Sequence, residues 1–64
     1  MNPSEYALTR LRRLIRTRRE KAGELNEAGI RLLDHAIYST YCDAVDLGAG
    51  DEARECLDAA AVTG

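Results

Sequence analysis

The apolar residues between Leu25 and Gly48 recur at the spacing of an amphipathic helix. At about 100° per residue, one narrow face carries Ile30, Leu33, Ile37, Tyr41 and Ala44. Further apolar residues at its edges widen this arc to about 220°, whereas a helix that packs on one neighbour needs a stripe of about 100°. The pattern therefore predicts a central helix over residues 27–47 that packs against two neighbours.

Both ends of the central helix carry local signals. Asn26 can cap the first turn, and Leu25 and Ile30 stand at the two positions of a hydrophobic staple. Gly48 follows the last apolar residue, Leu47, where a left-handed residue ends a helix at little steric cost. These residues predict where the helix starts and stops.

A first helix is predicted over residues 3–22. Asn2 can cap it, and Pro3 would occupy the first helical position, where its missing N–H costs nothing. Its apolar stripe consists of Leu8, Leu11 and Ile15, flanked by Ala7, Leu14 and Ala22. Gly23 is expected to end it. Because only residues 23–26 separate it from the central helix, the two should form an antiparallel hairpin.

A short third helix is predicted over residues 51–62, after a break at residues 48–51. Either Gly50 or Asp51 could cap it. Its apolar face is built mainly of small residues, namely Ala53, Cys56, Leu57, Ala60 and Ala61. The expected fold is all-α, an antiparallel helical hairpin plus a short third helix, which makes a small three-helix bundle. Residues 1–64 should form one helical domain.

The composition indicates a thin core. The 64 residues include thirteen Leu, Ile or Val and ten Ala, with no Phe or Trp. A chain of this length buries only about 60% of the surface that its unfolded form exposes, and such small folds often borrow core from a second copy. We therefore expect a homo-oligomer, in the simplest case a dimer. Its predicted interface is the wide face of the central helix: Leu32, Leu33, Ile37, Tyr38, Tyr41 and Val45.

The two cysteines, Cys42 and Cys56, could form one disulfide or remain free thiols. Two cysteines in 64 residues fall far below the density of secreted disulfide-rich domains, so free thiols are favoured. No segment approaches the roughly 20 apolar residues of a membrane span, and the N-terminus has no apolar core of a signal peptide. A cytoplasmic location and no membrane association are therefore expected.

The charges are distributed unevenly along the chain. Residues 1–22 carry seven basic and two acidic groups, a balance of +5, whereas residues 23–64 carry two basic and nine acidic groups, a balance of −7. The net charge of −2 therefore hides a chain with a basic and an acidic part. Such asymmetry suggests a charged partner.

The basic residues of the first helix form the candidate partner-binding site: Arg12, Arg16, Arg18, Arg19 and Lys21. The third helix offers Asp51, Glu55 and Asp58 at the same spacing as three of these arginines. However, at about 1.5 Å per residue a short third helix should reach only Arg10 and Arg13. The cluster nearer the hairpin loop is then incompletely neutralised. It is either a solvated face, paired within the protein or its oligomer, or a docking site.

Few residues suggest catalysis or metal binding. His35 is the single histidine and stands on the polar side of its helix, and the Cys42 to Cys56 spacing is not that of a zinc site. No enzyme and no cofactor are expected. The favoured hypothesis is a small adaptor or regulator that binds an acidic protein surface through its basic helix. The alternative is a nucleic-acid-binding protein that rests its Arg-rich first helix on a phosphate backbone.

Overall fold

Three helices account for most of the chain in the computed structural model, which describes residues 2–63 and the side chains of residues 2–60. They are α1 (Pro3–Lys21), α2 (Glu27–Asp46) and α3 (Gly50–Thr63). The described residues contain no strand. The prediction of an all-α fold with three helices is therefore confirmed, and each predicted helix differs from the observed one by a single residue at one or both ends.

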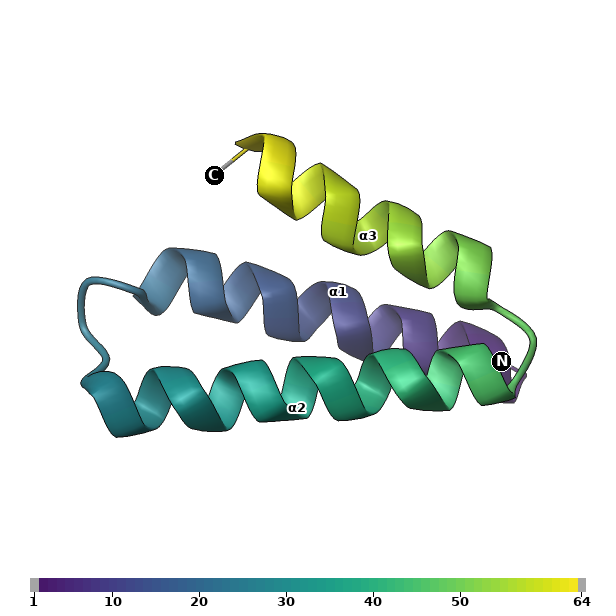
Figure 1. The fold of residues 1–64 in the computed structure, drawn as a ribbon, viewed down its shortest axis with the longest axis horizontal. Helices are drawn as coiled ribbons and strands as arrows, with labels where there is room; N and C mark the ends of the chain where they lie inside the picture. Colours follow the sequence, from purple (N-terminus) through teal and green to yellow (C-terminus); the bar gives the residue numbers. More distant parts are fainter. Residues whose placement is uncertain (1, 64) are drawn as a thin grey trace.

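The helices pack side by side in a molecule with extents of 33 × 22 × 17 Å. Figure 1 shows α1 and α2 lying antiparallel, with α3 returning alongside α1 in the same direction. The N-terminal end of α1 and the turn between α2 and α3 therefore lie at one end of the molecule. The loop of the hairpin lies at the other. All three pairs of helices are in contact.

Two asparagine side chains define the starts of α1 and α2. Oδ1 of Asn2 accepts a hydrogen bond from the Glu5 N–H at 2.8 Å, and Oδ1 of Asn26 accepts one from the Gly29 N–H at 2.8 Å. Each bond satisfies a backbone donor that has no partner within its own helix. Both predicted caps are thus confirmed, with Pro3 in the first turn of α1.

The end of α2 is closed by a Schellman motif around Gly48. The Gly48 N–H donates to the Val45 carbonyl at 3.0 Å, and the Ala49 N–H donates to the Ala44 carbonyl at 2.8 Å. Gly48 has a φ of 87°, the left-handed conformation that this motif requires and that a residue with a Cβ adopts only under strain. The predicted stop at Gly48 is confirmed.

Two other predicted end signals are wrong. Gly23 follows the end of α1 without the left-handed conformation; instead, the Lys21 carbonyl accepts from both Glu24 and Leu25, which tightens the last turn. Neither Gly50 nor Asp51 caps α3. The first hydrogen bond of α3 runs from the Ala53 N–H to the Ala49 carbonyl at 3.0 Å, so Ala49 holds the cap position. A connection this short leaves no room for a separate capping residue.

The core is small and made largely of alanine. Its buried hydrophobic residues are Ala7, Leu8, Leu11, Ala44, Ala49 and Ala53. Leu11 alone among the described side chains is both large and fully buried. The half-buried residues that pack against this cluster are Ile15, Ile37, Tyr41 and Cys56. Ala61, which was predicted on the same face of α3, lies outside the described side chains.

Replacing Gly48 with alanine should destabilise the fold by about 1 kcal/mol, because a Cβ is strained at positive φ. Gly23 is a matched control, since an added Cβ would meet nothing within 4 Å at either glycine and only Gly48 has a positive φ. Gly23→Ala should be neutral or stabilise by up to about 1 kcal/mol. Urea denaturation of both variants measures the difference. Equal effects of the two substitutions would contradict the role given to Gly48.

Truncating the central leucine, Leu11→Ala, should destabilise by about 2–5 kcal/mol, because it leaves a cavity where the three helices meet. A domain of this size has roughly 3–10 kcal/mol of stability in total. The melting temperature followed by circular dichroism should therefore fall by roughly 10 °C or more, since each 1 kcal/mol shifts it by about 4–8 °C in a domain of this size. Leu32→Ala, at a side chain that is 73% exposed, should change the stability by less than about 0.5 kcal/mol.

Candidate functional site

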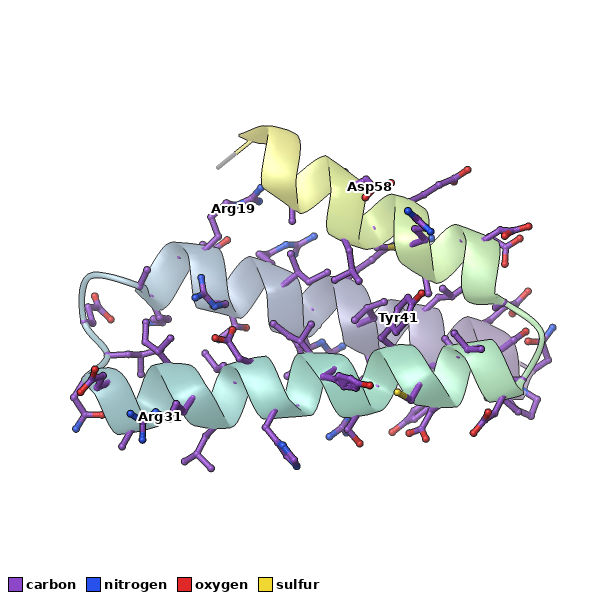
Figure 2. All side chains as sticks on the ribbon, in the orientation of Figure 1. Arg19, Arg31, Tyr41 and Asp58 are labelled. Atoms are coloured by element: carbon purple, nitrogen blue, oxygen red, sulfur yellow. The ribbon has the colours of Figure 1, made fainter. Side chains whose placement is uncertain are left out.

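The six residues predicted as an oligomer interface divide into two groups. Leu33, Ile37 and Tyr41 are half-buried, and the latter two pack against the core of their own chain. Figure 2 shows Tyr41 rising from α2 into the space between the helices. The exposed members are Leu32, Tyr38 and Val45. The wide apolar arc of α2 is thus partly used within one chain, because it packs against both α1 and α3.

The predicted basic site lies mainly along a groove between α1 and α3. One wall is formed by Arg12, Arg16 and Arg19 of α1, and Glu52 and Glu55 stand on the α3 side. The remaining lining residues are small or apolar: Ile15, Cys56, Ala59 and Ala60. The groove therefore combines an apolar surface with a basic wall and an acidic wall. We call it the α1–α3 groove.

The acidic residues of this groove differ from those suggested by spacing. Asp51 and Asp58 do not line it, and Figure 2 shows Asp58 on the outer side of α3. The predicted reach of α3 is also wrong. Although α3 is only one residue longer at each end than predicted, its residues Ala59 and Ala60 line the groove together with Arg19 of α1. Equal spacing of charged residues on two helices does not determine how each helix is rotated about its own axis.

Two other members of the basic cluster form ion pairs outside the groove. Nε of Arg18 donates to Oδ1 of Asp34 on α2 at 2.5 Å, and Nη2 lies 3.5 Å from Oδ2. Nζ of Lys21 lies 3.5 Å from Oε2 of Glu24. The sequence pattern does not mark Asp34 as the ion-pair partner of Arg18. Residues at similar distances from a hairpin loop face each other, but only the rotation of α2 brings Asp34 to this side.

The three groove arginines differ in their surroundings. Arg19 takes part in an interaction of its own, and Figure 2 shows it reaching from α1 toward the C-terminal part of α3. Arg12 and Arg16 are exposed. Among the described side chains neither of them forms an ion pair, although both line a groove with Glu52 and Glu55. The positive charges of Arg12 and Arg16 are therefore available to interact with a ligand in the groove.

A second groove lies between α1 and α2 at the end where α1 begins. Its apolar lining comes from Pro3, Tyr6, Ala7 and Leu47, and no described residue of α3 contributes to it. Tyr6 is 62% exposed and Leu47 is 47% exposed. Arg10 lies on the α1 side, and Asp43 and Asp46 lie on the α2 side. We call this second hollow the α1–α2 groove.

The remaining candidate chemistry is sparse. Cys42 and Cys56 are free, which confirms the favoured prediction, and His35 is exposed. Within the described residues, no group of three or more histidine, cysteine or acidic side chains could hold a metal ion. None of the helices in that part of the chain is long and apolar enough to span a membrane.

No protein-family model, no curated protein and no solved structure matches this chain.

The Arg18–Asp34 pair should contribute about 0.2–1 kcal/mol, because its side chains are 41% and 52% exposed and water screens the attraction. A double-mutant cycle with Arg18→Ala and Asp34→Ala measures this coupling free energy. It should decrease in 1 M NaCl. A parallel cycle that replaces Arg16 and Asp34 should give a coupling near zero, since Arg16 lines the α1–α3 groove. Equal coupling in the two cycles would contradict this pairing.

Proposed function

We propose that this protein is a small non-enzymatic adaptor or regulator of the cytoplasm, working as a homodimer, that binds a protein partner in the α1–α3 groove. One observation carries the proposal. Arg12 and Arg16 line a groove that also holds four small or apolar residues, and they form no ion pair among the described side chains, even though two glutamates line the same groove. Such a site suits an amphipathic segment with carboxylates along one edge.

The chemistry of the groove describes the partner segment. Its apolar side would cover Ile15, Cys56 and the alanines of α3, where small side chains let a second backbone approach closely. Its carboxylates would lie toward Arg12 and Arg16, where charge-assisted hydrogen bonds form with guanidinium groups. Glu52 and Glu55 favour basic or neutral residues along the opposite edge. The two walls would thus orient the segment as well as bind it.

The repulsion within α1 also supports a ligand at this site. Arg12 and Arg16 are four residues apart on one helix, a like-charge pair that is unfavourable by about 0.2–0.5 kcal/mol. An acidic partner would relieve this repulsion. Nucleic acid, the alternative, is disfavoured here because a phosphate backbone in this groove would meet Glu52 and Glu55.

Replacing both groove cations, Arg12→Gln and Arg16→Gln, should abolish binding of the partner while the stability changes by less than about 0.5 kcal/mol. Glutamine keeps the helix propensity of arginine and removes its charge. The matched control is Arg31→Gln with Arg54→Gln, which changes the net charge equally outside this groove. Figure 2 shows Arg31 on the outer side of α2. Affinity purification from the native cells with all three baits, compared by mass spectrometry, tests the proposal.

The supporting result is a protein that is retained by the wild type and the control but lost by the groove variant. A partner retained equally by all three baits would refute the groove as the binding site. A strongly lowered melting temperature of the groove variant would assign Arg12 and Arg16 a structural role instead. Nuclease-sensitive, salt-dependent absorbance at 260 nm in the wild-type eluate, lost in the groove variant, would favour the nucleic-acid alternative.

A further inference from the structure

The side of the hairpin that carries the α1–α2 groove presents exposed apolar side chains at several points. At the open end of the hairpin, the exposed Tyr6 and Leu47 line the groove from opposite helices. On α2, Leu32, Ala36, Asp43 and Leu47 follow one another at intervals of four, seven and four residues, so they lie along one side of the helix. This row of three apolar residues and Asp43 therefore continues from the groove toward the hairpin loop at Leu32, and we call the row together with the groove the strip.

The two helices bring opposite charges to this strip. Arg10 comes from α1, with Arg13 nearby beside Tyr6, whereas Asp43 and Asp46 come from α2. Among the described side chains, none of these four charged groups forms an ion pair. The strip thus carries its basic groups on α1 and its acidic groups on α2, with exposed apolar side chains on both helices. A surface of this kind can be complementary to itself.

We infer that a second copy of the chain docks on this strip, related by a two-fold axis that runs along the hairpin. Such an axis places α1 of each protomer over α2 of its partner and keeps residues at the same height opposite one another. Because Arg10, Asp43 and Asp46 line one groove, they share a height. Arg10 of each protomer then faces the carboxylates of the other, and Tyr6 faces Leu47, as an isologous interface requires.

The other simple two-fold arrangement is disfavoured by charge. An axis perpendicular to the helices would lay α1 on α1, and residues 1–22 carry seven basic and two acidic groups. Like charges placed opposite one another at an interface cost several kcal/mol. The arrangement along the hairpin instead builds a four-helix contact from two hairpins, with α3 of each copy outside it. It also supplies the buried apolar area that one small chain lacks.

This inference rests on the homodimer of the proposed function and locates its interface away from the α1–α3 groove. It replaces the interface predicted from the sequence, in which Ile37 and Tyr41 already pack in the core of their own chain. Of that predicted set, Leu32 lies on the strip. The α1–α3 groove of each copy stays open for the partner segment.

The test is a charge exchange measured by sedimentation equilibrium over a wide concentration range. The wild type should approach twice its mass of 7.1 kDa. Arg10→Asp alone and the pair Asp43→Arg with Asp46→Arg should each raise the dimer Kd by about tenfold or more, since each reverses both symmetry-related contacts. A mixture of the two variants should restore wild-type association, because both contacts between unlike chains are then attractive. Thermal melts establish that each variant is folded before mixing.

Three results would overturn the inference. They are a wild type that stays monomeric at millimolar concentration, folded variants that fail to associate when mixed, and an Arg10→Asp variant that dimerises more tightly than the wild type, which would indicate packing of α1 on α1. The variant with Arg12→Gln and Arg16→Gln separates this interface from the α1–α3 groove. It should dimerise like the wild type, so a failed dimer with intact partner binding, or the reverse, identifies which proposal is wrong.

Discussion

The close approach of three helices around Leu11 is the contact on which the rest of the fold depends. Four of the six buried hydrophobic residues are alanines, so the helices approach one another over short side chains, and Leu11 fills the space that remains. Such packing excludes water with little side-chain volume, but it buries little area per residue. The fold can therefore hold its helices close without a large core. It also leaves the larger side chains Tyr6, Leu32 and Tyr38 exposed on the surface.

The basic helix is placed where both other helices can balance part of its charge. Asp34 of α2 pairs with Arg18 on one side, and Glu52 and Glu55 of α3 share a groove with Arg12 and Arg16 on the other. Neutralisation is close on the α2 side and incomplete on the α3 side. Arg18 thus has an ion-pair partner within the hairpin, whereas Arg12 and Arg16 form no ion pair among the described side chains.

Features that depend on a few neighbouring residues were predictable from the sequence. Asn2 and Asn26 cap their helices through hydrogen bonds that span three residues, and Gly48 ends α2 through a local backbone motif. The capping role of Ala49 was missed because it follows from how the end of α2 is closed. No side-chain preference marks an alanine as a cap.

For the candidate site, the sequence predicts only that basic residues cluster on one helix. The sequence identifies Arg12 and Arg16 as basic residues that share a helix, and the structure places them beside α3. Their counterparts on α3 and the Arg18–Asp34 pair depend on helix rotation and on the reach of α3. Both are set by packing between residues far apart in the chain. Composition likewise indicated a thin core, but not that Ile37 and Tyr41 would turn inward while Leu32 stayed exposed.

Only residues 47–49 separate α2 from α3, and the hydrogen bonds of Ala49 among them have a mechanical consequence. Its N–H closes the end of α2 and its carbonyl starts α3, so one peptide unit on each side is held by a helix. Sliding the base of α3 along the hairpin would therefore break hydrogen bonds at the end of α2 or at the start of α3. A rotation of α3 about this end would preserve them, and it would widen the α1–α3 groove least near Glu52 and most near Ala60.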